Sequence, residues 1–178
     1  MYSNPRGIRS KIHSLNSALE AEQPDILILV ESQLAGKYNI KIDGYDKQIK
    51  RNRTTKGGGL LVATRNSSDL EMILVSSDEN HEQMTVQISS NIWKFRLCIV
   101  YGLQESRSSE DDIDDWYYNL EKTIAENEEE PLLIVGDLNA HIGNDENGIH
   151  HNTPHINTNG RLLREMIQRR NLDVAALH

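Results

Sequence analysis

Short aliphatic runs and longer amphipathic stretches alternate along the chain, so both strands and helices are predicted. Residues 8–19, 113–124 and 162–167 have apolar side chains at helical spacing, and Pro24 follows the first of these stretches. "DILILVES", "GGGLLVATR" and "PLLIVGDLN" indicate buried strands, "MTVQIS" and "KFRLCIVYG" alternate with a period of two, and "DVAAL" begins a last strand. A helix-covered mixed sheet and a two-sheet sandwich with outer helices both fit this pattern.

The remaining bulk properties favour one globular domain over residues 1–178. Hydrophobic residues make up 37% of the chain, and no repeat or Pro/Gly-rich linker divides it. The longest aliphatic runs, such as "ILILV", fall far short of the roughly 20 residues that a membrane-spanning helix needs. The first residues contain no apolar signal segment, and the single cysteine, Cys98, excludes an internal disulfide. We therefore expect no membrane association and an intracellular location, with the nucleus as one candidate compartment.

Charge is distributed unevenly along the chain, which has a formal net charge of −8. Residues 37–56 hold seven basic side chains against two acidic ones, whereas residues 105–130 contain "EDDIDD" and "ENEEE". A basic patch on an acidic body can still bind phosphates, because counterion release depends on local contacts. The stretch predicts nucleic-acid contacts at Lys50, Arg51, Arg53 and Lys56. The alternative is that both charged stretches are simply solvated surface.

Polar residues that a core does not need stand at the ends of three predicted strands. Glu31 follows "ILILV", Tyr101 follows "LCIV", and Asp137 and Asn139 follow "LLIVG". Two carboxylates and an amide are hard oxygen ligands, which favour Mg²⁺ or Mn²⁺ over zinc. Such a site suits the hydrolysis of phosphate esters. Each residue also has a simpler interpretation: a loop start for Glu31, an Asx-type turn for the Asp-Leu-Asn segment, and a half-buried aromatic for Tyr101.

Six sequence blocks, in order, resemble a known family. They are "NPRGIRSK", "PDILILVES", "GGGLLVA", "VYGLQES", "IVGDLNAHIG" and "NTNGRLL". Together they resemble the endonuclease/exonuclease/phosphatase superfamily over essentially the whole chain, and most closely the endonuclease domains of non-LTR retrotransposons. The resemblance implies an α+β fold, a four-layer α/β/β/α sandwich with two mixed, mainly antiparallel sheets, incomplete at the C-terminus.

The resemblance also implies a role for each candidate residue. Asn4 resembles the asparagine that helps organise the metal site, and Glu31 resembles the metal-binding glutamate. Tyr101 resembles the tyrosine that hydrogen-bonds the scissile phosphate. Asp137 resembles the aspartate that activates the attacking water, and Asn139 the asparagine that contacts phosphate. The implied activity is that of a Mg²⁺-dependent endonuclease (Mn²⁺ being a second candidate metal) acting on the phosphodiester backbone of DNA.

One block of the family has no counterpart in this sequence. The family completes its site with a Ser-Asp-His block near the C-terminus, and no such block follows "NTNGRLL". Because members of a catalytic set act as a unit, we expect this chain alone to be weakly active or inactive. Two alternatives remain open: a non-catalytic remnant that binds metal or a partner, and a phosphatase or phosphodiesterase of the same fold that acts on a lipid or inositol phosphate.

Overall fold

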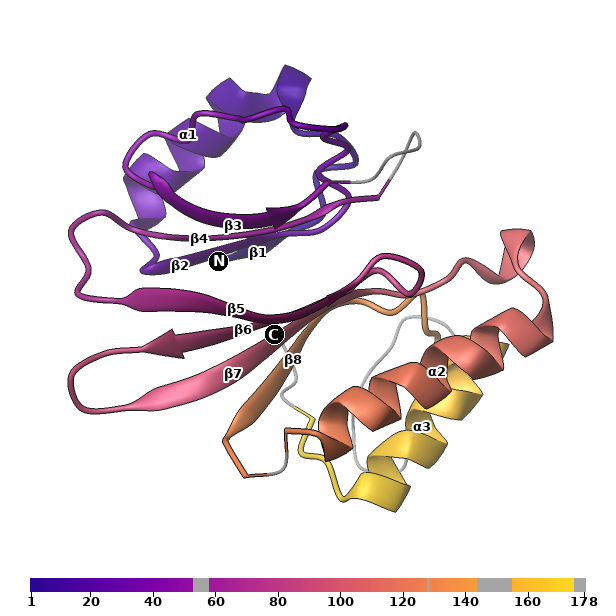
Figure 1. The fold of residues 1–178 in the computed structure, drawn as a ribbon. Coiled ribbons are helices and arrows are strands. Elements are labelled where there is room, and N and C mark those ends of the chain that lie inside the picture. The colour runs from indigo at the N-terminus through magenta and orange to yellow at the C-terminus, as the bar shows by residue number, and fades with distance from the viewer. Residues whose placement is uncertain (53–57, 128, 144–154, 175–178) are drawn as a thin grey trace. The chain divides into compact units, whose positions relative to one another are not determined.

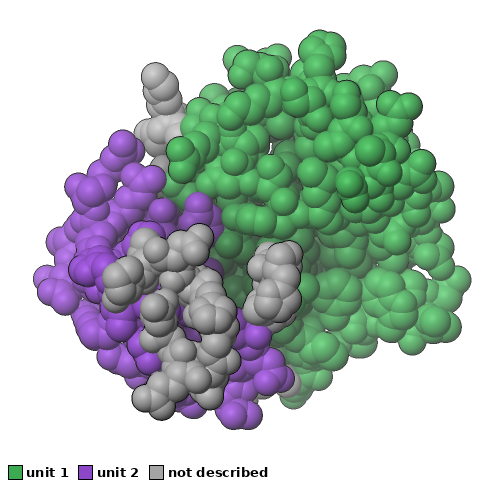
Figure 2. Space-filling view, turned by 180° about the vertical axis from the view of Figure 1, so that it is seen from behind, with its two compact units in different colours: residues 1–101, 127–136 green, residues 102–126, 137–178 purple. Residues whose placement is uncertain are grey.

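The computed structural model describes residues 1–52, 58–127, 129–143 and 155–174 (Figure 1). The chain forms two compact units, which Figure 2 shows in separate colours. Unit 1 consists of residues 1–101 and 127–136, and unit 2 of residues 102–126 and 137–178. The chain therefore leaves unit 1 twice, and returns to it once.

Two four-stranded sheets form the frame of unit 1. The first has the order β1 (Tyr2–Ser3), β2 (Ile26–Leu29), β4 (Leu60–Thr64), β3 (Lys47–Arg51), and only its β1–β2 pair is parallel. The second has the order β5 (Glu71–Asp78), β6 (Gln83–Ser89), β7 (Lys94–Tyr101), β8 (Leu132–Asp137), and β5, β6 and β7 are antiparallel. Strands β7 and β8 run parallel. Arg96 N donates to Pro131 O (2.8 Å) and, six residues further along both segments, Gly102 N donates to Asp137 O (2.7 Å).

Apolar side chains from both sheets form one shared core in unit 1. Alternate residues of a strand point to the same face, so each strand supplies every second residue to this core. The buried members are Ile28, Val30, Leu60, Val62, Leu70, Met84, Val86, Ile88, Leu97 and Ile99. The two sheets therefore pack face to face as a sandwich.

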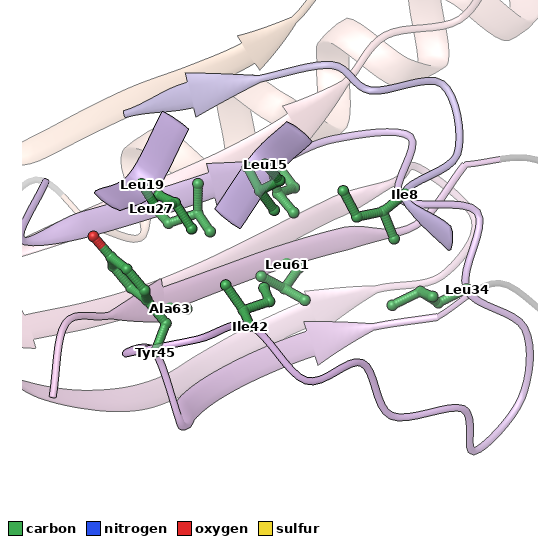
Figure 3. Close-up of a cluster of buried hydrophobic side chains, with 10 residues drawn as sticks. Ile8, Leu15, Leu19, Leu27, Leu34, Ile42, Tyr45, Leu61 and Ala63 are labelled. Atoms are coloured by element: carbon green, nitrogen blue, oxygen red, sulfur yellow. The ribbon is translucent and has the colours of Figure 1, made fainter. Parts of the chain in front are cut away.

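Helix α1 (Ile12–Glu22), preceded by the short helix η1 (Arg9–Lys11), covers the other face of the first sheet. Leu15 and Leu19 pack among sheet residues that include Leu27 and Leu61 (Figure 3). Burying a leucine contributes about 1.5–3 kcal/mol, so this apolar stripe holds the helix to the sheet. The helix ends at Gln23, which is left-handed and donates its backbone N–H to the carbonyl of Leu19, one residue before Pro24.

Unit 2 contains a short helix, η2 (Glu105–Arg107), and two long helices, α2 (Glu110–Ala125) and α3 (Thr158–Arg170). A capping box of Ser109 and Asp112 starts α2. The two long helices pack together: the Tyr117 hydroxyl donates to the carbonyl of Asn159 at 2.9 Å, and Glu121 on α2 pairs with Arg169 and Arg170 on α3.

The α+β prediction with two mixed, mainly antiparallel sheets is confirmed. Every predicted helix is present, and so are the predicted strands except "DVAAL", whose residues 175–177 lie outside the described residues. Strands β3 and β5 were not predicted. The single-domain interpretation stays a prediction. Within the part of the chain that the structure describes, no helix is long and apolar enough to cross a membrane.

Candidate active site

The first pair of predicted site residues meets in unit 1. Glu31 follows β2, and Tyr101 is the last residue of β7. The Tyr101 hydroxyl donates a hydrogen bond to Oε1 of Glu31, which joins residues 70 positions apart in sequence. Glu31 also has a left-handed backbone (φ 50°), a conformation that costs a non-glycine residue energy and is concentrated at functional sites. The sandwich therefore fixes both the backbone and the carboxylate of Glu31.

Asn4 follows β1, and Glu31 follows the neighbouring strand, β2. Strands β1 and β2 are parallel with Ser3 opposite Leu29, and Val30 N donates to the carbonyl of Ser3 at 3.1 Å. Parallel strands present their carboxyl ends at one edge, so Asn4 and Glu31 follow strands that end at the same edge of the sheet. The Asn4 side chain accepts a hydrogen bond from the backbone N–H of Arg6 at 3.1 Å.

The donor chemistry at this edge fits Mg²⁺ or Mn²⁺. Glu31 supplies a carboxylate of which only one oxygen takes the Tyr101 hydrogen bond, and Asn4 supplies an amide oxygen. Mg²⁺ usually keeps several waters and binds protein through one or two carboxylates, so it does not need a crowded protein cage. Among the described residues there is no group of three or more His, Cys, Asp or Glu side chains that could hold a metal ion.

The second pair lies in unit 2: Asp137 is the last residue of β8, and Asn139 follows two residues later. Oδ1 of Asp137 accepts the backbone N–H of Asn139 at 3.0 Å, the geometry of an Asx turn. The Asn139 side-chain amide donates to the carbonyl of Gly102 at 2.7 Å, and Asn139 is left-handed (φ 51°). The turn interpretation is thus correct as geometry. It does not exclude a catalytic role, because the same turn holds both side chains in defined positions.

Two glycines allow the backbones of this region to approach closely. A Cβ atom added to Gly136 would lie 1.9 Å from the carbonyl oxygen of Val100, within unit 1. A Cβ atom added to Gly102 would lie 2.5 Å from the carbonyl oxygen of Leu138, within unit 2. Both contacts are shorter than real Cβ atoms make. Glycine is therefore required by packing before Asp137 and after Tyr101.

The structure corrects the predicted role of Arg51. Its side chain is buried and pairs with the buried carboxylate of Glu82 at 2.8 Å, so Arg51 is not an exposed phosphate contact. The other oxygen of Glu82 accepts the backbone N–H of Gly59 at 3.1 Å. A buried ion pair with further hydrogen bonds braces β3 against the turn before β6.

Of the remaining predicted nucleic-acid contacts, Lys50 is described and two are not. Lys50 is partly exposed on β3, and its ammonium donates to the carbonyl of Tyr38 at 3.1 Å. The guanidinium of Arg9 lies 3.7 Å from the centre of the Tyr38 ring, which is 46% exposed. Arg53 and Lys56 lie outside the described residues.

Cys98 is unsuited to nucleophilic chemistry. Burial in β7 raises the pKa of its thiol to about 11, with a hydrogen bond to the Thr85 side chain acting in the opposite direction. The thiolate is the reactive form of cysteine, so a pKa this high keeps Cys98 inert at neutral pH. Cys98 is therefore not a candidate nucleophile.

Comparison with known sequences shows the family of this chain. The sequence pattern of the endonuclease/exonuclease/phosphatase family matches residues 3–162, which include all five predicted metal and catalytic residues. The chain belongs to the endonuclease/exonuclease/phosphatase family. Hydrolysis of phosphodiester bonds is the chemistry of this nuclease-containing family. No curated protein sequence matches the chain significantly.

Solved structures of the same fold include enzymes that process DNA. An AP endonuclease from Leishmania major is 20% identical, with a TM-score of 0.62, over 96% of this chain and 66% of that one. An AP endonuclease from Archaeoglobus fulgidus is 15% identical, with a TM-score of 0.67, over 94% and 69%. The endonuclease domain of TRAS1, a telomere-specific non-LTR retrotransposon, is 14% identical, with a TM-score of 0.68, over 94% and 70%. These similarities show a shared fold, and this chain spans about two thirds of the neighbours' length.

The structure brings the predicted residues together as two pairs, Glu31 with Tyr101 and Asp137 with Asn139, each within its own unit. Sequence reasoning missed two residues that support nearby segments. Glu82 was not singled out, since its pairing with Arg51 spans 31 residues. Asn157 was seen only as part of "NTNGRLL", although an asparagine shortly before an amphipathic helical stretch is a capping signal.

Proposed function

We propose that this chain carries the catalytic residues of a metal-dependent DNA endonuclease of the retrotransposon type. The observation that carries the proposal is the hydrogen bond between Tyr101 and Glu31, two residues 70 positions apart that strand ends bring into contact. A core does not require a carboxylate and a hydroxyl there, whereas a metal-binding carboxylate beside a hydroxyl donor suits the hydrolysis of a phosphodiester. Nicking of supercoiled plasmid by an excess of the chain, with and without Mg²⁺, tests the proposal.

Each side chain has a role that its contacts support. Glu31 and Asn4 would hold Mg²⁺, which when bound supplies positive charge that stabilises the phosphate and the leaving oxygen. The Tyr101 hydroxyl donates a hydrogen bond to Glu31 in the free chain. With substrate bound, it would donate to a phosphate oxygen. Asp137 orients and deprotonates the attacking water as a general base. Asn139 keeps the turn in place through Gly102 and contacts phosphate.

DNA is the proposed substrate because proteins of similar fold act on it. Two of the neighbours are described as AP endonucleases, and a third as the endonuclease domain of a retrotransposon. A further neighbour is a 3′ phosphatase from Neisseria, bound to a product DNA hairpin. That protein favours a phosphatase acting on DNA ends as the second candidate function. A 3′-phosphorylated oligonucleotide separates the two, since the phosphatase alone would release inorganic phosphate.

We propose low activity for this chain measured alone. The sequence contains no Ser-Asp-His block after "NTNGRLL", so the aspartate and histidine that the resemblance implies are not supplied by this chain. Losing one member of a catalytic unit commonly costs several orders of magnitude in rate. Magnesium titration separates a weak enzyme from a non-catalytic remnant, because the remnant would bind the ion without any turnover.

Replacing Lys50 with glutamate is expected to weaken DNA binding and to make it less sensitive to salt. Lys50, Arg9 and the exposed Tyr38 ring together form a basic and aromatic surface on unit 1. One lost phosphate contact reduces the steepness of the plot of log binding constant against log salt concentration by about one. Fluorescence anisotropy with labelled duplex DNA in EDTA measures this slope without cleavage.

The matched control for the Lys50 reversal is Lys122→Glu. Lys122 lies on α2 and has an exposed side chain 3.9 Å from the exposed carboxylate of Glu126. It changes the net charge by the same amount, so a general effect of charge would lower both slopes equally. An unchanged slope in the Lys50 variant would show that this surface does not contact the DNA backbone.

A further inference from the structure

One asparagine side chain in unit 2 connects the start of α3 to the turn that carries Asn139. Asn157 is the N-cap of α3, and its Oδ1 accepts the backbone N–H of Gly160 at 2.8 Å. The same oxygen accepts the backbone N–H of His141 at 2.8 Å. Its Nδ2 donates to the carbonyl of Asn139 at 2.9 Å. Asn157 is 9% exposed, so these bonds lie away from bulk solvent.

An N-cap needs only one of these three hydrogen bonds. Serine, threonine or aspartate would satisfy the Gly160 amide equally well, because capping requires a single acceptor. The contact with the Asn139 carbonyl requires a donor as well. Serine and threonine have donor and acceptor on one hydroxyl, whereas asparagine carries them on two separate atoms, which here reach different backbone groups. The use of both ends of the amide therefore indicates a task other than starting the helix.

The backbone that Asn157 contacts depends on such support. Asn139 is left-handed, a conformation that costs most residues about 1–2 kcal/mol, that asparagine tolerates better, and that surrounding contacts stabilise. The helix start is also pressed against this segment: a Cβ atom on Gly160 would lie 1.9 Å from the carbonyl oxygen of His141. The first turn of α3 and residues 139–141 thus form one packed body, with Asn157 at its centre.

We propose that Asn157 is a positioning residue for the Asp137–Asn139 turn. Asn157 fixes the carbonyl of Asn139, and the backbone N–H of Asn139 is bound by the Asp137 carboxylate. A shift of the turn therefore moves both side chains of the pair at once. This inference rests on the proposed function for its catalytic consequence, while the geometric part concerns Asn157 and the turn alone.

Two variants separate positioning from capping. Asn157→Asp keeps an acceptor for His141 and Gly160 but places an oxygen against the Asn139 carbonyl. Asn157→Ser keeps a capping hydroxyl, has no amide donor and adds no charge. Both are expected to lower kcat for DNA cleavage about 10- to 100-fold with a smaller change in KM, because misplaced groups act on the chemical step. Only the aspartate variant introduces a charge, so an electrostatic effect would raise KM in that variant alone.

The control is Ser109→Ala, which removes the cap of α2 in the same unit. The Ser109 hydroxyl accepts the backbone N–H of Asp112 at 3.2 Å and donates to the Asp112 carboxylate at 2.6 Å. This control is expected to lower thermal stability while leaving kcat unchanged. If kcat of the three variants simply follows their thermal stability, Asn157 has only a structural role and the proposal fails.

Amide hydrogen exchange gives a readout that does not need activity. The Asn139 backbone N–H is expected to exchange at least about tenfold faster in both Asn157 variants, because its turn loses its support. The His141 N–H should remain protected in the aspartate variant and lose protection in the serine variant, whose side chain is too short to reach it. If the Asn139 N–H is equally protected from exchange in the parent chain and in both variants, the proposal fails. If these exchange changes occur but the parent chain does not cleave DNA, only the proposed function fails.

Discussion

Replacing Asp137 with asparagine is expected to lower the rate of DNA cleavage about 10²- to 10⁴-fold, the usual contribution of a general base. The substitution keeps the carbonyl oxygen that accepts the Asn139 N–H, so the Asx turn survives. It removes only the negative charge and the ability to take a proton. Single-turnover nicking with an excess of protein measures the rate without a contribution from product release.

Asp114→Asn is the matched control for this loss of charge. Asp114 is exposed on α2, in the same unit as Asp137. Its replacement should leave the nicking rate unchanged, and both variants should unfold at the temperature of the parent chain. If Asp137→Asn cleaves as fast as Asp114→Asn, Asp137 takes no part in the chemistry.

Gly136→Ala is expected to destabilise unit 1 by about 3 kcal/mol or more, at or above the upper end of the usual cost of overpacking. The added Cβ atom would lie 1.9 Å from the carbonyl oxygen of Val100, so two neighbouring strands would have to separate. Urea unfolding followed by tryptophan fluorescence measures the change in the free energy of unfolding.

Gly36→Ala isolates this steric effect. No atom lies within 4 Å of an added Cβ at Gly36, but Gly36 has a φ of +55°. Its replacement should cost about 1–2 kcal/mol, through backbone conformation alone. A Gly136 variant as stable as the parent would mean that β7 and β8 are not packed as described here.

Sequence patterns predicted those elements whose burial follows a simple period. The helical spacing of Leu15 and Leu19 predicted α1, and the aliphatic run "ILILV" predicted β2. Strand β3 was missed because "KQIKR" is mostly basic, and the burial of its Arg51 depends on Glu82, 31 residues away. Strand β5 was missed because Ile73, Leu74 and Val75 are consecutive and exposed, and a bulge between Leu74 and Ser76 interrupts the alternation.

The candidate site divides in the same way. Asp137 and Asn139 could be found from "GDLN", since their interaction is local. The Glu31–Tyr101 contact could be inferred only from the family resemblance, because no local pattern specifies which strand ends meet. The role of Asn157 depends on which backbone groups the packed loop presents to it, and this is decided by tertiary structure.

The central claim is that Glu31 binds the metal while Asp137 activates water, and a magnesium titration of plasmid nicking tests it most directly. The chain is compared with Glu31→Gln, which keeps an oxygen for the Tyr101 hydroxyl, and with Asp137→Asn. We expect slow nicking by the parent chain that requires Mg²⁺. The Mg²⁺ concentration at half-maximal rate should be raised at least about tenfold in Glu31→Gln, as expected for a weakened ligand. No Mg²⁺ concentration should restore nicking by Asp137→Asn. Nicking that persists in EDTA, or equal Mg²⁺ midpoints and rates in all three proteins, would contradict the account.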